Sequence, residues 1–115
     1  MYRVDKTVET AADWIEDWCP EALDAEIRRD LATEDAANGR LYGYLDVYDL
    51  LRTGGWPQSG ADRDALCRRW ECTGRTLYQW RRDVLLLFAF ARMHWHIMKE
   101  VTDAVTNAAP EKPQE

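Results

Sequence analysis

Arginine is the residue type in this chain whose number and spacing suggest chemistry. Six arginines lie between residues 63 and 82, where the only acidic residues are Asp64 and Glu71. The whole chain, in contrast, has a net charge of −6, and residues 1–51 carry 13 acidic and 5 basic side chains. A guanidinium group is a rigid fork of donors that fits phosphate oxygens and the edge of guanine. Because the charges are separated along the chain, residues 63–82 are a candidate surface for an anionic partner.

The other reactive residue types do not form a recognisable catalytic or metal-binding pattern. His94 and His96 are two residues apart, so on a helix they point to nearly opposite sides and cannot share a metal ion. Cys67 and Cys72 fall at apolar positions of a helical pattern, and we expect them to be buried and free of metal. Ser59 is the only serine and has no evident base. We therefore expect no enzyme activity, no metal and no cofactor.

Length and composition predict one small all-α domain. With 46% hydrophobic residues, 115 residues suffice for a single core, and the scarcity of glycine and proline favours helices. We assign the domain to residues 1–107 and a disordered tail to 108–115. Three cysteines indicate a reducing compartment, and Met1–Thr10 lacks the apolar core of a signal peptide. We expect a cytoplasmic protein that does not enter a membrane.

Apolar spacing and capping signals predict about five helices. Thr10 and Asp13 resemble an N-cap signal, so we expect the first helix to start there. Ser59 with Asp62 predicts the start of the helix that carries Leu66. Three apolar stripes define the faces of the first three helices: Ala11, Trp14, Ile15 and Trp18; Leu23, Ile27 and Leu31; and Leu41, Tyr44, Leu45, Tyr48 and Leu51. We expect breaks at Pro20, at Asn38-Gly39 and in the loop Gly54–Gly60, and we place Trp14, Trp18, Trp70 and Trp80 in the core.

Residues 65–82 read ALCRRWECTGRTLYQWRR. This stretch resembles the helix-turn-helix of excisionases, transposase DNA-binding domains, small terminases and bacterial repressors. Cys67 occupies the small position where the two helices of that family cross, and Thr73 occupies the cap of the second helix. The apolar positions that flank the crossing are matched by Leu66, Trp70, Cys72, Leu77 and Trp80. Glu71 departs from the family, because the turn position with a left-handed backbone is usually glycine.

The resemblance implies that the start of the second helix enters the major groove of double-stranded DNA. The residues expected to contact bases are then Thr73, Gly74, Arg75, Tyr78 and Gln79. The residues expected to contact phosphates are Arg68, Arg69, Arg81 and Arg82. The implied role is a transcription regulator or a mobile-element or phage accessory factor. The alternative is a protein-interaction module, such as a phage-type inhibitor, that uses its acidic N-terminal helices on the same scaffold and mimics DNA.

After Gly74, the segment as far as Asn107 contains no further glycine or proline and is apolar on two faces. A straight helix of this length is longer than a small domain is wide. We therefore expect it either to bend or break near Arg82-Asp83, or to project and need a partner. Either way, we expect a homodimer or higher oligomer. The residues expected in the oligomer contact are Val84, Phe88, Phe90, Trp95 and Met98.

Overall fold

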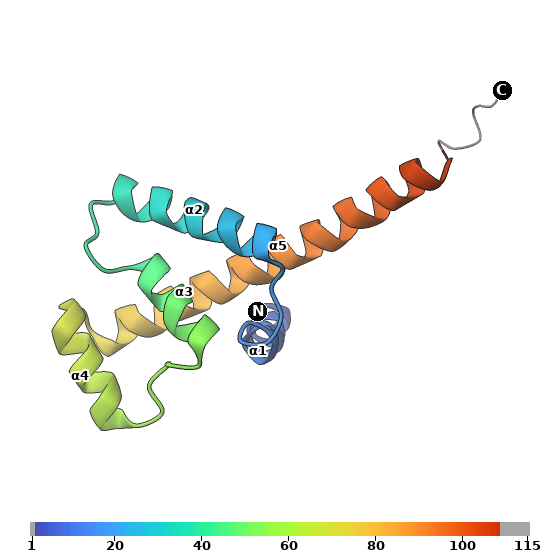
Figure 1. Cartoon of the computed structure of the whole chain (residues 1–115). Helices are drawn as coiled ribbons and strands as arrows, with labels where there is room; N and C mark the ends of the chain where they lie inside the picture. Colours follow the sequence, from blue (N-terminus) through green and yellow to red (C-terminus); the bar gives the residue numbers. More distant parts are fainter. Residues whose placement is uncertain (1, 109–115) are drawn as a thin grey trace.

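The computed structural model describes residues 2–108, with side chains described for residues 6–107. Five α-helices and no strand occur in this range, which confirms the all-α class (Figure 1). In chain order the helices are α1 (Tyr2–Trp14), α2 (Glu21–Ala37), α3 (Tyr44–Thr53), α4 (Gly60–Trp70) and α5 (Gly74–Ala108). The assigned tail falls, from residue 109 onward, outside the described residues.

The predicted start of the first helix at Thr10 is wrong. Helix α1 already begins at Tyr2, and the Thr10 hydroxyl donates to the Lys6 carbonyl 2.9 Å away, within the helix. The apolar face of this helix extends ahead of Thr10, since Val8 packs against the core. Trp14 was also misplaced, since its side chain is 40% exposed whereas Ile15 beside it is 1% exposed.

The second and third apolar stripes are largely confirmed. Leu23, Ile27 and Leu31 of α2 are buried, and the helix ends at Ala37 with Asn38 as its C-cap. In α3, Tyr48 is fully buried. Leu41, which we placed on the same face, lies before the helix and is 86% exposed.

The start of α3 is capped by a carboxylate from α2. Asp35 is buried, and its two oxygens each accept a 3.0 Å hydrogen bond, from the backbone N–H groups of Tyr44 and Leu45. The guanidinium of Arg40 lies 3.3 Å from the same carboxylate. A Cβ atom at Gly43 would approach an oxygen of Asp35 to 2.5 Å, so glycine leaves the space that this cap requires. Asp35 therefore satisfies donors that a helix start otherwise leaves without partners.

Tyr48 is the polar centre of an otherwise apolar core. Its hydroxyl donates to Asp24 over 2.6 Å, and burial raises the pKa of this phenol far above its ordinary value. Arg28 and Arg52 both pair with Asp24, and Arg52 also donates to the carbonyl of Ile15 just after α1. This network joins α2 and α3 to the end of α1 and gives the charges of Asp24, Arg28 and Arg52 partners at the edge of the core.

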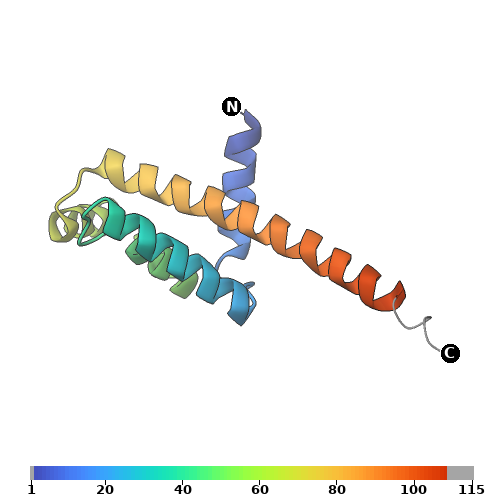
Figure 2. The same cartoon turned by 90° about the horizontal axis from the view of Figure 1, so that it is seen from above.

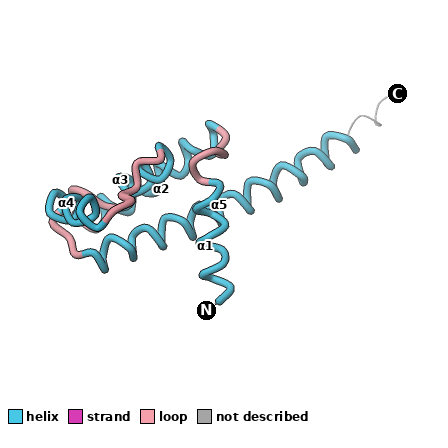
Figure 3. The backbone as a smooth tube through the Cα atoms, turned by 90° about the horizontal axis from the view of Figure 1, so that it is seen from below, coloured by secondary structure: helices cyan, strands magenta, loops and turns pink. Residues whose placement is uncertain are grey.

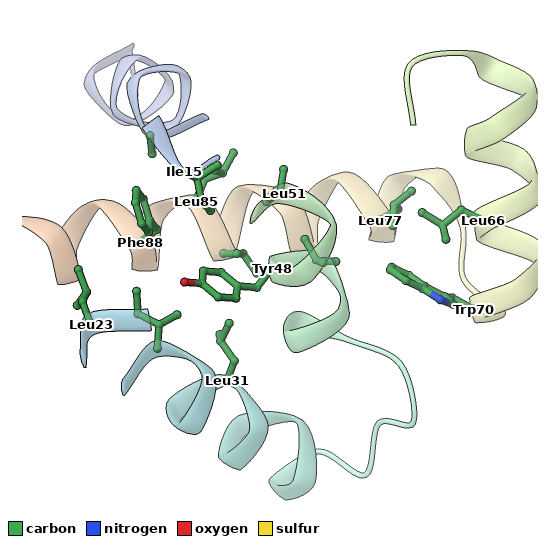
Figure 4. Close-up of a cluster of buried hydrophobic side chains, with 14 residues drawn as sticks. Ile15, Leu23, Leu31, Tyr48, Leu51, Leu66, Trp70, Leu77, Leu85 and Phe88 are labelled. Carbon is green, nitrogen blue, oxygen red and sulfur yellow. The ribbon is translucent and has the colours of Figure 1, made fainter. Parts of the chain in front are cut away.

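Helix α5 runs without a break through Arg82 and Asp83, so it projects rather than bending sharply (Figures 2 and 3). Its first half lies in the core, where Leu77, Leu85 and Phe88 contact side chains of the other helices (Figure 4). Val84 and Phe88 are at most 1% exposed, so they cannot make the oligomer contact that we assigned to them. Although α5 has 35 residues, nothing in the described chain is apolar enough over a sufficient length to span a membrane.

The cap on α3 predicts a large stability effect at one position. Replacing Asp35→Ala should lower the free energy of unfolding by about 1–3 kcal/mol, because two backbone donors and Arg40 lose their buried partner. Asp30→Ala is the matched control on the same helix, because Asp30 is exposed and should leave stability within about 0.5 kcal/mol of the original. Urea unfolding followed by circular dichroism measures both values. Equal effects of the two substitutions would contradict the role of Asp35.

Candidate nucleic-acid interface

Helix α4 begins with the side-chain cap that the sequence predicts. The hydroxyl of Ser59 accepts a 3.1 Å hydrogen bond from the backbone N–H of Asp62. At the other end of the helix Leu66 and Trp70 are buried and lie beside Leu77 of α5 (Figure 4). Trp70 also stacks on Tyr42, with ring centroids 5.9 Å apart. Apolar packing therefore fixes α4 against the beginning of α5.

A three-residue turn, 71–73, joins α4 to α5. Glu71 has φ 54° and ψ 48°, so the left-handed backbone expected at this position is confirmed despite the absence of glycine. The N–H of Cys72 donates to the carbonyl of Cys67 over 3.0 Å, which closes the end of α4. Thr73 accepts a 3.1 Å hydrogen bond from the N–H of Thr76, so its assignment as the cap of the second helix is confirmed. Hydrogen bonds therefore fix the turn both where α4 ends and where α5 begins.

The two cysteines of this unit are only half-buried, which corrects our expectation of full burial. Both cysteines pack against the core from its edge, so each keeps part of its surface in contact with solvent. Burial, reinforced by the adjacent Cys67, raises the pKa of the Cys72 thiol to about 11. Its thiol therefore stays protonated at neutral pH. Across the described residues, no group of three or more His, Cys, Asp or Glu is arranged to hold a metal ion.

The residues that we expected to contact bases divide into two groups. Arg75 and Gln79 are exposed on the first turns of α5 and are free to reach a partner. Thr73 is exposed, but its hydroxyl is occupied by the cap, and Gly74 is half-buried. The hydroxyl of Tyr78 accepts a 3.1 Å hydrogen bond from Arg63. Of the five residues, Arg75 and Gln79 are therefore the two that are exposed and that no hydrogen bond or cap described above occupies.

Arg63 is a member of this surface to which sequence reasoning assigned no role. Its guanidinium lies 5.8 Å from the centre of the Tyr78 ring, and Trp56 meets the same ring edge-on at 6.2 Å. Arg81 in turn lies 5.6 Å from the centre of the Trp56 ring. The loop before α4 is thereby held against α5. The signal was present in the sequence as an arginine four residues after the Ser59 cap, but only the fold shows which ring it meets.

The arginines of residues 63–82 have no carboxylate partners. Among the described residues, none of the six lies within ion-pair distance of an Asp or Glu. Arg28, Arg40 and Arg52, in contrast, are each neutralised by an aspartate. Arg68 and Arg69 are exposed and Arg82 is half-buried, whereas the Nε of Arg81 is buried without a hydrogen-bond partner. The arginines around α4 and the start of α5, which lie at one end of the molecule (Figure 1), thus form no ion pair within the described residues.

A comparison of the chain with family models, curated proteins and solved structures finds no match.

The raised pKa of Cys72 predicts a loss of stability at alkaline pH. The native state holds this proton more tightly than the unfolded chain, so the contribution is complete below pH about 9 and is lost as pH rises toward about 11. Urea unfolding at about pH 8 and about pH 10.5 should show a smaller alkaline loss for Cys72→Ala than for the original chain. An identical loss in both proteins would contradict this assignment, because lysines and tyrosines titrate equally in the two.

Proposed function

We propose that this chain is a non-enzymatic DNA-binding protein that uses α4, the turn 71–73 and the start of α5. The observation that carries the proposal is a set of six arginines around a capped turn that have no carboxylate partner among the side chains of residues 6–107. Guanidinium groups left unpaired by the fold remain available to release counterions from a phosphate backbone. A role as a transcription regulator or as a mobile-element or phage accessory factor fits this activity.

The beginning of α5 suits the major groove. Its backbone N–H groups point out of the helix start, where the helix dipole adds partial positive charge. Arg75 and Gln79 are four residues apart and therefore share one face of the helix. Arginine pairs with guanine and glutamine with adenine through two hydrogen bonds each. We assign base reading to these two side chains.

The remaining polar residues position the helix. Arg68 and Arg69 are exposed at the end of α4, next to the turn, which suits contacts with phosphates on one side of the groove. Arg63, Tyr78 and Trp56 hold the loop before α4 in place. In this arrangement Tyr78 supports the surface rather than reading a base.

The acidic N-terminal half of the chain weakens non-specific binding to DNA. Exposed carboxylates on α2, among them Glu26, Asp30 and Glu34, repel a polyanion that approaches from that side. Affinity for arbitrary DNA is therefore low at physiological salt, and specific contacts dominate binding. The same carboxylates would carry the function if the partner were a basic protein surface, and the experiment below separates these two possibilities.

Replacing Arg75→Ala or Gln79→Ala should weaken binding to DNA selected from a random pool by about 1–3 kcal/mol and relax the preference at one base position. Arg69→Ala should instead weaken all sequences alike and make the salt dependence shallower, because a phosphate contact does not read bases. Fluorescence anisotropy at several salt concentrations measures both effects.

Arg29→Ala is the matched control, because Arg29 is an exposed arginine on α2, on a different helix from the proposed surface. It should leave affinity and salt dependence unchanged, and all variants should keep their helix content. If selection recovers no sequence and low-salt binding is insensitive to Arg69 and Arg75, the DNA-binding proposal is wrong. The acidic helices would then be the surface to test for a protein partner.

A further inference from the structure

The second half of α5 leaves an apolar face without a partner. Beyond His96, whose ring stacks on Trp18 with centroids 5.3 Å apart, every described side chain through Asn107 is exposed. Several large apolar side chains of this half are 46–64% exposed and recur at intervals of one to four residues. They are Phe90, Met93, Ile97, Met98, Val101 and Val105. A stripe of this size on a projecting helix indicates an interaction surface.

A groove continues this stripe toward the core. It lies between α1 and α5 with a volume of about 440 Å³, and Trp14, Phe90 and Met93 form much of its apolar lining. Two cations also border it. Lys6 is exposed, and Arg92 lies over the Trp14 ring at 3.7 Å with its Nε lacking a hydrogen-bond partner. The groove therefore suits an apolar segment that carries negative charge.

The far end of α5 has these properties. It presents Val101 and Val105 together with Glu100, while Asp103 pairs with Lys99 at 3.4 Å, and its last turn contains no basic residue. The helix dipole adds further negative charge at this end. The chain thus carries both the groove and a segment complementary to it, but a straight helix cannot fold back to reach its own groove.

We infer that two copies of the chain pair antiparallel through the second halves of their α5 helices, each placing its C-terminal end in the α1–α5 groove of the other. A two-fold axis between Ile97 and Met98 sets Phe90 level with Val105 of the second copy, and both residues belong to the apolar stripe. The same surface patch then serves both copies, as two-fold symmetry requires. A parallel pairing would instead set the two C-terminal ends of α5 side by side, where their helix dipoles repel, and would leave both grooves without the segment that suits them.

This pairing also fixes the spacing of the two proposed DNA-binding units, and this step alone rests on the proposed function. At about 1.5 Å per residue, the first turns of the two α5 helices lie roughly 60–70 Å apart along the paired helices. This separation corresponds to about two turns of B-DNA, whereas adjacent half-sites one turn apart lie about 34–36 Å from each other. Two selected half-sites should therefore bind cooperatively at about 20 base pairs and not at about 10.

The pairing is tested without DNA. Light scattering on the full chain over a dilution series should give twice the chain mass of 13.4 kDa at high concentration. Ile97→Glu should raise the dissociation constant at least about tenfold, because two carboxylates would meet near the axis. Leu41→Glu makes the same kind of change at an exposed apolar residue before α3 and should leave the dimer intact. A monomeric original chain, or a dimer unaffected by Ile97→Glu, would overturn the inference whether or not DNA binds.

Orientation is tested by amine-to-carboxylate crosslinking of a mixture of isotopically light and heavy chains. The antiparallel arrangement predicts crosslinks between the two isotopic forms that join Lys6 to Glu100 or Asp103. Dimers that lack these links and join Lys99 to Asp103 between copies would show a parallel pairing and overturn the proposed register. Ile97→Glu, with unchanged helix content by circular dichroism, should abolish the Lys6 crosslinks.

Discussion

Burial of the first half of α5 is the interaction on which the rest of the structure depends. Each of the four shorter helices contacts α5, and α2 with α3 is the other substantial helix pair. Leu77, Leu85 and Phe88 have no exposed surface, so three side chains spread along the first half of α5 are completely covered by the core. Apolar burial brings the helices together, whereas polar groups determine where the helices start and how they are joined. Asp35 sets where α3 begins, and the network around Tyr48 ties α2 and α3 to the end of α1.

Local signals predicted much of the candidate site because its geometry is determined locally. A hydroxyl at Ser59 or Thr73 needs only the next few residues to cap a helix, and the left-handed turn at Glu71 follows from the spacing of its neighbours. The start of α1 was missed for a related reason. Thr10 has the residue type of a cap, but its hydroxyl donates to a helical carbonyl, an alternative that sequence alone does not distinguish.

What sequence reasoning could not supply depends on contacts between distant segments. Whether an arginine is neutralised is decided by the carboxylates that the fold brings near it, so Arg28 and Arg68 look alike in sequence and differ in the structure. Burial on α5 shows the same limit. Val84 and Phe90 both lie on apolar faces, but the first is covered by the other helices and the second is 58% exposed.

Because α5 is continuous, its C-terminal end remains helical through its connection to the buried half of the same helix. The residues from Ile97 to Ala108 make up about three turns, and an isolated helix of that length is marginal in water. Their helical state depends on a nucleus that the core supplies further back along the same helix. In a single chain, amide hydrogen exchange should therefore become progressively faster from Trp95 toward the end of α5, as terminal turns fray. The core thus stabilises, by helix propagation, a helical segment with which it makes no contact.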